Sequence, residues 1–276
     1  MKGSLIALDH WNGREAAARM IDGRLDDLLI DPVNAPRIGA MFAAKVERPL
    51  KGQGGAIVSW PGGQGFLRRA KGLSPGTTLK VQVSGYAEPG KAPPVTDRLL
   101  FKSRYAIITP DAPGLNVSRA IKDEDRRDQL KGLAISEMAD APENWGLILR
   151  SAAEAAADEA VSEDIAAMID ACMAAVESTS DLGKLSPGDG PHLMAWREWG
   201  GADQIETQDG CFEDHGILDD VEKLAAPLVD LGPHSMAVEP TRALIAVDVN
   251  TGQDVSPAAP LKANLAALKD LPRQLR

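Results

Sequence analysis

The sequence is poor in cysteine, in aromatic residues and in long apolar runs. It has two cysteines among 276 residues, and aromatic residues make up 4%. Cys172 and Cys211 match no disulfide framework or zinc motif, so we expect reduced thiols in a cytoplasmic protein. No run of about 18 apolar residues occurs, so we expect no membrane-spanning helix. The amino-terminal stretch MKGSLIALDHWNGREAA combines a short apolar run with a charged flank, which argues against a secretory signal.

Several common enzyme motifs are also missing. The four histidines (His10, His192, His215 and His234) show no metal-ligand spacing. The sequence offers no arrangement of Ser, His and Asp or of Cys and His that indicates a nucleophile, and no phosphate-binding loop ending in GK[ST]. The apolar content of 44% is ordinary for a globular protein. The length allows two domains.

Charge is distributed unevenly along a chain whose net charge is −10. Residues 32–104 contain twelve Lys or Arg against three Asp or Glu, a net charge of +9. Residues 151–230 contain three basic against nineteen acidic residues, a net charge of −16. The basic segment can follow a phosphate backbone and the acidic segment cannot. This asymmetry indicates polyanion binding by the first part of the chain, without indicating specificity.

The Gly- and Pro-rich segment 37–98 predicts a small β-barrel. Its short strand-like stretches are residues 38–46, 55–60, 65–67, 78–86 and 94–100. Five short strands within this length are typical of an oligonucleotide/oligosaccharide-binding barrel.

The segments on either side of this barrel favour mixed α and β structure. Residues 15–21 and 24–30 flank Asp22–Gly23, a dipeptide favoured in type I′ turns, and predict a hairpin. Residues 151–178 predict an Ala-rich helix whose start resembles a capping box, Ser151 to Glu154. Residues 180–209 are irregular, and residues 210–231 predict an acidic helix and loop.

The stretch TRALIAVDVN, residues 241–250, is the most informative part of the chain. The apolar run 243–247 suits a strand buried on both faces, and it ends at Asp248. An ionised Asp in such a place needs a cation or strong donors. Asn250 lies two residues on and points to the same side, which suits a hard-cation site. The alternative is a carboxylate satisfied by backbone donors.

The final segment, LKANLAALKDLPRQLR, predicts a helix. Leu261, Leu265, Leu268 and Leu275 share one of its faces. Pro272 should kink or interrupt it.

Both C-terminal stretches resemble the ribonuclease E/G family. TRALIAVDVNTG and KANLAALKDLPRQLR are similar to the family's TEALxAIDVNSG and TNLEAAxEIARQLRLR. The resemblance implies that Asp248 is a Mg²⁺ ligand and that Asn250 positions it. It places a second Asp, on a later strand, beyond Arg276. We therefore expect a Mg²⁺-dependent endoribonuclease acting on single-stranded RNA, with a metal site that is incomplete in this chain.

In that family an S1 RNA-binding domain is inserted into an RNase H-like domain. The stretches GGAIVSW, GQGFLRR and LSPGTTLKVQV are similar to its AAFVDxG, GFLP and GQxVxVQV segments. The resemblance implies that Phe66 stacks on a base while Arg68 and Arg69 hold phosphates, with Lys91 close to phosphate. Alternatively, Phe66 belongs to the barrel core and Lys91 is a solvated turn residue. Ile57 replaces a second expected aromatic residue.

A third group of motifs implies recognition of the RNA 5′ end. RYAIITP, NVSRAIKDEDRRDQL and GLILRSA resemble the family's RYLVLMP, ISRRIxxxxER and GLIVRTA. The resemblance implies that Arg150 and Ser151 bind a 5′-monophosphate, that the backbone of Ile107 lines the pocket and that Arg119 lies near the scissile strand. A guanidinium fork beside a hydroxyl suits phosphate. Alternatively, Ser151 caps a helix, Arg150 is a surface charge and Arg119 pairs with Asp123.

Together these motifs imply an α+β fold, in which an RNase H-like α/β core carries an inserted S1/OB-type five-stranded β-barrel. The expected segments are 1–35 (first part of the RNase H-like domain), 36–100 (barrel), 101–176 (5′-sensor-like region) and 177–276 (second RNase H-like part and start of the catalytic domain). A homo-oligomer is compatible with the resemblance. The rival hypotheses are a non-catalytic RNA-binding protein that uses the barrel and an acidic scaffold that uses residues 151–230.

Overall fold

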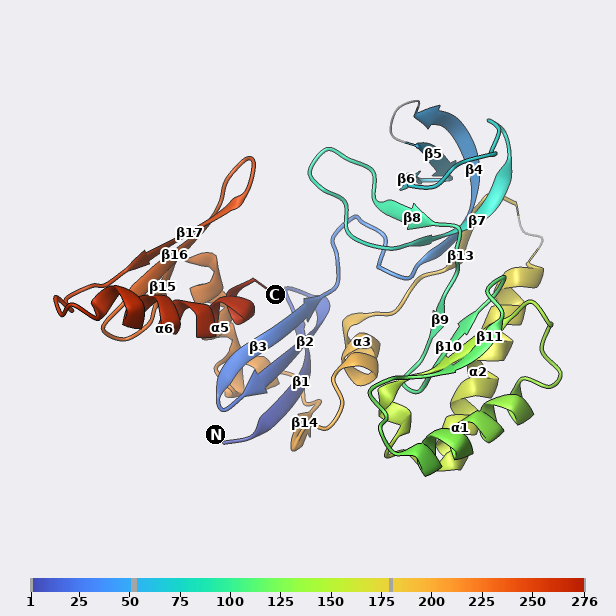
Figure 1. Ribbon diagram of the computed structural model, residues 1–276. Coiled ribbons are helices and arrows are strands. Elements are labelled where there is room, and N and C mark those ends of the chain that lie inside the picture. Colours follow the sequence, from blue (N-terminus) through green and yellow to red (C-terminus); the bar gives the residue numbers. More distant parts are fainter. Residues whose placement is uncertain (1, 51–53, 179–180, 276) are drawn as a thin grey trace. The chain divides into compact units, whose positions relative to one another are not determined.

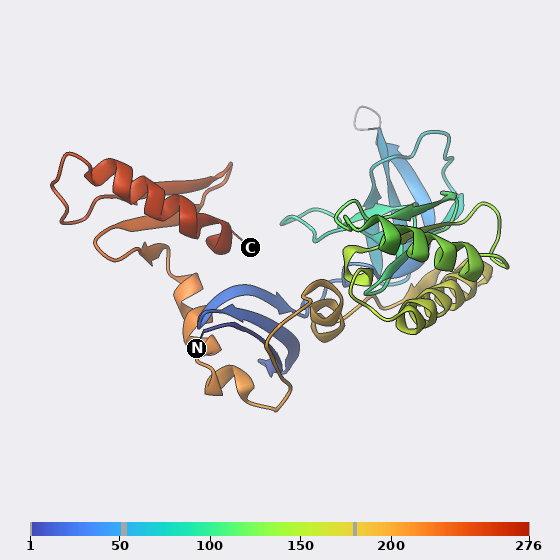
Figure 2. The same cartoon turned by 60° about the horizontal axis from the view of Figure 1, so that its bottom comes forward.

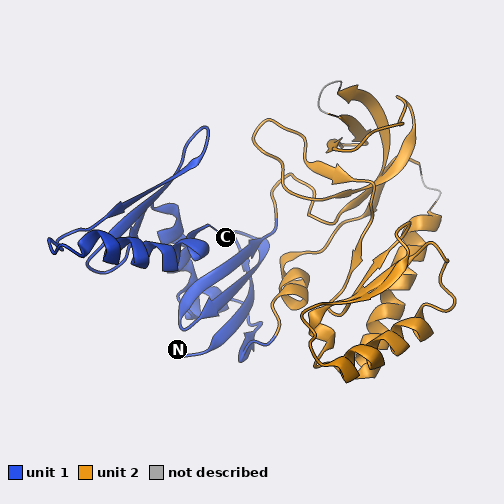
Figure 3. Cartoon of the chain, in the orientation of Figure 1, with its two compact units in different colours: residues 1–31, 201–276 blue, residues 32–200 orange. Residues whose placement is uncertain are grey.

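The computed structural model describes residues 2–50, 54–178 and 181–275. The chain divides into two compact units (Figure 3). Unit 1 combines residues 1–31 with 201–276, and unit 2 is the continuous segment 32–200. Within the described ranges, every helix is too short or too polar to serve as a bilayer crossing.

Unit 2 contains the predicted barrel, which five strands close. They are β4 (Met41–Leu50), β5 (Gly55–Trp60), β6 (Gly63–Leu67), β7 (Thr78–Val83) and β8 (Pro94–Thr96). The pairing runs β4-β5-β6-β8-β7, and a further antiparallel pairing of β7 with β4 closes the ring. Only β6 and β8 run parallel among these pairs. The prediction of a five-stranded barrel within a mixed α+β chain is therefore confirmed.

The barrel is closed around alternate side chains of its strands. Val46, Val58, Leu67, Val81 and Val95 are buried inside it. The rings of Phe42 and Trp60 stack with 4.2 Å between their centroids. A Cβ on Gly65 would come within 2.7 Å of Val95 and 3.1 Å of Trp60, so only glycine fits there.

The second part of unit 2 is a four-stranded sheet with two helices on one face (Figures 1 and 2). Its strands, in the order β11-β12-β10-β9, are β9 (Phe101–Lys102), β10 (Ala106–Thr109), β11 (Gly114–Val117) and β12 (Gly146–Leu149). The helices are α1 (Glu124–Glu137) and α2 (Asp158–Glu177). Ile108, Leu147 and Leu149 of the sheet are buried with Leu130 and Ile165 of the helices.

The predicted capping box at Ser151 and Glu154 is wrong. Residues Ser151–Ala153 form a 3₁₀ turn, and α2 begins only at Asp158 without a side-chain cap. Helix α1 explains this late start of α2. The guanidinium of Arg126 donates hydrogen bonds to the carbonyls of Ala153, Glu154 and Ala156 at 2.7 to 3.1 Å. These bonds hold residues 153–156 in a turn. An α-helix over the same residues would use these carbonyls for its own backbone hydrogen bonds.

Two further elements of unit 2 lie in the stretch that we expected to be irregular. Strand β13 (Gly183–Ser186) pairs antiparallel with β4 of the barrel. Helix α3 (Pro191–Glu198) follows, with Pro191 at its first position. Both are too short for periodicity to reveal them.

Unit 1 has an amino-terminal sheet in the order β14-β1-β2-β3. Its strands are β1 (Ser4–Trp11), β2 (Arg14–Ile21), β3 (Arg24–Ile30) and β14 (Gln204–Glu206). The predicted hairpin is confirmed, with positive φ angles of 50° at Asp22 and 74° at Gly23. The short helices α4 (Cys211–Asp214) and α5 (Ile217–Ala225) bury Phe212 and Ile217 in the same core as Leu5.

The rest of unit 1 is a three-stranded sheet with one helix. The strands are β15 (Leu228–Asp230), β16 (Ser235–Pro240) and β17 (Ile245–Asn250), and the helix is α6 (Ala259–Gln274). The expectation of a strand buried on both faces is wrong. Among the described strands β17 pairs with β16 and lies at the sheet edge, with Ile245 56% exposed. An apolar run predicts a strand, but it does not reveal how many layers cover it.

Helix α6 packs through its alanines and exposes its leucines. Ala259, Ala263 and Ala267 are buried, whereas Leu268 is 64% exposed. Leucine periodicity identified the helix, but the small residues form the face that packs against the sheet. Pro272 does not interrupt the helix, which continues to Gln274. A proline in the last turn removes a single backbone donor.

Candidate nucleic-acid interface

Phe66 lies on the outside of the barrel. It pairs with Ile57 across β5 and β6, is half-buried, and is not among the buried side chains of the barrel core. Its ring lies over Gly55, where a Cβ would come within 2.6 Å of the ring carbons. The glycine thus lets an aromatic ring lie close against the strand.

The basic residues near Phe66 differ in their surroundings. Arg68 and Arg69 follow β6 directly and are exposed. Lys91 forms an ion pair with Glu88 in the loop between β7 and β8. Hydrogen bonding to Lys91 holds the pKa of Glu88 below its usual range, which favours the charged carboxylate. A phosphate must therefore compete with Glu88 for Lys91.

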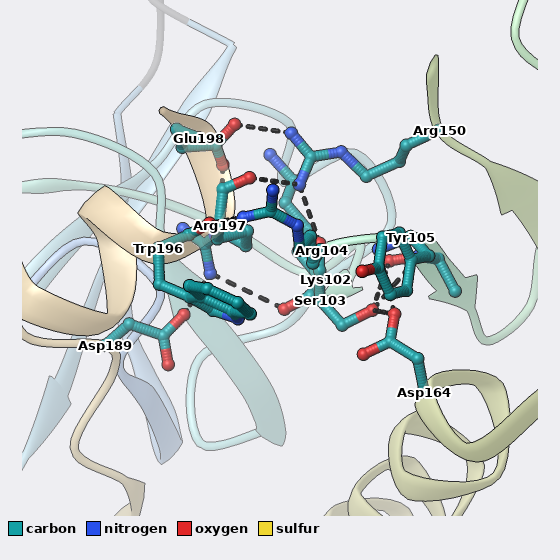
Figure 4. Close-up of polar contacts among 11 residues, drawn as sticks. Lys102, Ser103, Arg104, Tyr105, Arg150, Asp164, Asp189, Trp196, Arg197 and Glu198 are labelled. Atoms are coloured by element: carbon teal, nitrogen blue, oxygen red, sulfur yellow. Dashed lines mark hydrogen bonds and ion pairs between the residues drawn. The ribbon is translucent and has the colours of Figure 1, made fainter. Parts of the chain in front are cut away.

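Arg150 follows the last residue of β12, and the partners drawn in Figure 4 belong to unit 2. Its backbone N–H donates to the carbonyl of Tyr105 at 2.8 Å. Its Nη1 donates to the carbonyl of Ser103 at 2.6 Å, and its Nη2 pairs with the carboxylate of Glu198 on α3. Arg150 is thus an ion-paired arginine whose side chain is 21% exposed.

Glu198 joins Arg150 to a second arginine. Its Oε1 accepts from Nε of Arg197 at 2.8 Å, and Arg197 in turn pairs with Asp189. Burial raises the pKa of Glu198, but hydrogen bonds from Arg197 and Arg150 outweigh this and keep the pKa below its usual value. The carboxylate is thus ionised between two guanidinium groups.

Arg104 lies against the same turn of α3. Its Nη1 donates to the carbonyl of Trp196 at 2.5 Å, and its guanidinium lies 4.3 Å from the centroid of the Trp196 ring. Trp196 is 53% exposed. Sequence reasoning missed Trp196 and Glu198, because no motif marks them and more than forty residues separate them from Arg150.

The loop that carries Arg104 is fixed to helix α2. One carboxylate oxygen of Asp164 accepts from the backbone N–H of Tyr105 at 2.8 Å and from the hydroxyl of Ser103. The oxygen of the Ser103 hydroxyl also accepts from the backbone N–H of Ala106 at 3.1 Å. These bonds preorganise the backbone that receives Arg150.

The structure brings together only part of the other predicted 5′-end residues. Ser151 is exposed in the 3₁₀ turn directly after Arg150. Ile107 lies in β10 between Lys102 of β9 and Ile148 of β12. Arg119 is exposed. Asp123 caps α1 by accepting from the Arg126 N–H at 3.0 Å, and the ion pairs recorded for the described residues do not join it to Arg119.

Asp248 and Asn250 lie side by side on the edge strand of unit 1. Both are exposed, and Nδ2 of Asn250 donates to Oδ2 of Asp248 at 2.9 Å. This confirms that the two side chains point the same way. The carboxylate keeps acceptor sites, so it could serve as one oxygen ligand of a hard cation such as Mg²⁺.

A different group of residues in unit 1 has metal-ligand spacing. Ligand atoms of Asp9, His10 and Asp209 lie within 4.8 Å of one another. However, Asp9 accepts backbone N–H bonds from His10 at 2.7 Å and from Phe212 at 2.9 Å. Burial opposes these bonds, yet the pKa of Asp9 remains below its usual value. Asp9 therefore serves to attach the start of α4 to β1.

Comparisons with known proteins point to one family. The model of the ribonuclease E/G family matches residues 101–186, the part that carries Arg150 and Ser151. Ribonuclease E of Nostoc sp. is 26% identical over the whole chain, and ribonuclease E of Synechocystis sp. is 34% identical over 36% of it. The chain covers 48% of the Nostoc protein and 15% of the Synechocystis protein. The chain is homologous to ribonuclease E over its full length, and its residues 101–186 match the ribonuclease E/G family.

Proposed function

We propose that this chain acts in RNA processing or decay as part of a Mg²⁺-dependent endoribonuclease that cleaves single-stranded RNA. In this proposal the barrel binds RNA through Phe66, Arg68, Arg69 and Lys91, and Arg119 lies near the strand to be cut. The observation that carries the proposal is the family match on the sheet that holds Arg150.

The proposal assigns the 5′-monophosphate of the substrate to Arg150 and Ser151, with the backbone of Ile107 beside them. A guanidinium offers a planar pair of donors, and the Ser151 hydroxyl adds another. Residues 1–35 and the first part of 177–276 would form the RNase H-like domain, around the barrel at 36–100 and the sensor at 101–176.

The proposed metal ligand is Asp248, oriented by Asn250. Mg²⁺, when bound, supplies an activated water and stabilises charge on the scissile phosphate. Asp248 contributes a single exposed carboxylate, and Asn250 fixes its orientation through the hydrogen bond at 2.9 Å. Because Mg²⁺ favours several oxygen ligands, we expect weak binding and low activity from this chain by itself.

The test is Mg²⁺-dependent cleavage of a short single-stranded RNA that carries a 5′-monophosphate. The wild-type chain should cleave slowly, Asp248→Asn should not cleave measurably, and a chelator should abolish the activity. Equal rates for wild type and Asp248→Asn would end the assignment of Asp248.

The single carboxylate also favours a second candidate, a non-catalytic RNA-binding protein. Its signature is RNA binding that depends on salt and not on Mg²⁺. The substitution Arg68→Glu/Arg69→Glu should then remove binding. Lys122→Glu/Lys131→Glu makes the same change in charge at two exposed positions, one just before α1 and one within it, and is the matched control. Failure of the Arg68/Arg69 variant to weaken binding would exclude the barrel as the RNA-binding surface in both candidates.

A further inference from the structure

We propose that Glu198 determines the affinity and the 5′-end preference of the Arg150 site, because a terminal phosphate must displace its carboxylate. This inference rests on the proposed binding of a 5′-monophosphate by Arg150. It adds a residue of α3 to that site.

The geometry gives Glu198 the place that a phosphate would take. Arg150 directs Nη1 to the Ser103 carbonyl at 2.6 Å, a contact within its own sheet and loop. The outward Nη2 carries the carboxylate of Glu198 (Figure 4). A phosphate that approaches Arg150 from solvent therefore meets a guanidinium whose available edge already holds an anion.

Displacement is possible because Glu198 has a second partner. Its other oxygen accepts from Nε of Arg197 at 2.8 Å, and its side chain is 38% exposed. When it leaves Arg150, the carboxylate keeps one guanidinium and gains water, so no charge is left buried without a partner. The exchange replaces the carboxylate on Arg150 by a phosphate and requires no refolding of α3.

Charge decides which phosphates can make this exchange. A terminal monophosphate carries about −1.5 to −2 at neutral pH, whereas a carboxylate and an internal phosphodiester each carry one negative charge. The carboxylate is also tethered beside Arg150, which gives it a high effective concentration. A terminal phosphate can outcompete it, while an internal phosphodiester of equal charge does not. The carboxylate thus weakens binding of the 5′ end and leaves RNA with a 5′-hydroxyl almost unaffected.

The test compares the affinities of one short RNA with a 5′-monophosphate or a 5′-hydroxyl, at fixed salt, by fluorescence anisotropy. Glu198→Gln should tighten binding of the monophosphorylated RNA roughly fivefold, the equivalent of one partly exposed ion pair. The affinity for the 5′-hydroxyl RNA should change by less than about twofold. The preference for a 5′-monophosphate over a 5′-hydroxyl therefore increases. Aspartate has a shorter side chain than glutamate, so the affinity of Glu198→Asp for the monophosphorylated RNA should lie between those of wild type and Glu198→Gln.

Two controls separate the possible explanations. Glu163→Gln removes the same charge from an exposed position on α2 and should leave the preference unchanged. Arg150→Gln should abolish the preference; if it does not, the proposed phosphate site is wrong. If Arg150→Gln abolishes the preference and Glu198→Gln leaves it unchanged or lowers it, the role of Glu198 is wrong while the site stands.

Discussion

The side chain of Arg150 shows how much a single residue can depend on its neighbours. Its three recorded acceptors, two carbonyls and a carboxylate, come from the loop after β9 and from α3. Family motifs identified Arg150, because arginine followed by a hydroxyl is a pattern visible in sequence. They did not identify Trp196 or Glu198, which reach Arg150 and Arg104 only through the packing of α3.

Arg150→Lys tests the importance of the guanidinium shape. Lysine keeps the charge but offers a point donor in place of a planar fork. We expect the affinity for RNA with a 5′-monophosphate to fall about tenfold, with little change for the 5′-hydroxyl RNA. Titrations of the two RNAs check this. An equal loss for both RNAs would indicate a general role in RNA binding.

The two cysteines should be inert in the folded protein. Burial raises the pKa of Cys172 to about 12 and that of Cys211 to about 11. Because the reactive form is the thiolate, a thiol reagent at neutral pH should label neither residue in the folded chain and both in denaturant. Rapid labelling of the native protein at either residue would contradict this burial.

At the scale of elements, Arg126 joins α1 to the turn that precedes α2. Its side chain is 14% exposed and pairs with Asp158, besides bonding three carbonyls of the turn. Arg126→Ala leaves these acceptors without their donor, and we expect it to lower the free energy of unfolding by about 2–3 kcal/mol. Denaturant unfolding measures the change. Lys131→Ala, on the same helix but exposed, should change it by less than about 0.5 kcal/mol.

Helix α6 provides a second test at this scale. Ala263 is buried against the sheet, so Ala263→Leu should overpack the contact and cost about 1–3 kcal/mol. Leu265→Gln lies on the exposed face and should alter stability by less than about 0.5 kcal/mol. Thermal unfolding of the two variants checks this. The opposite order would mean that the leucines form the packed face.

Sequence patterns predicted the presence of helices and strands better than they predicted which of their faces are buried. The barrel strands and the hairpin at Asp22–Gly23 could be predicted, because turn residues and alternation are local signals. The burial of β17, the packed face of α6 and the start of α2 could not. Each depends on a partner distant in sequence, such as Arg126 for the turn before α2.

At the scale of the whole molecule, charge and architecture agree. The segment 32–104, which has twelve basic and three acidic residues, contains the closed barrel. The excess of acidic residues lies in 151–230. RNA binding that rests on this basic segment should weaken steeply with salt, with the slope reduced by about 1 to 2 in Arg68→Glu/Arg69→Glu. Affinities measured at several salt concentrations give the slope. If the salt dependence of the variant's RNA affinity equals that of the wild type, Arg68 and Arg69 do not contact phosphates.

The sheet of unit 1 also imposes an order of events during synthesis. Strand β1 pairs with β14 in parallel register, Leu5 opposite Gln204 and Ile6 opposite Ile205, and all of unit 2 lies between them in the chain. On a ribosome that adds about 5–20 residues per second, the hairpin of β1 and β2 emerges roughly 10–40 s before its missing neighbour. The nascent amino-terminal hairpin must therefore keep its β1 edge unpaired while unit 2 is synthesised, and β14 completes the sheet only afterwards.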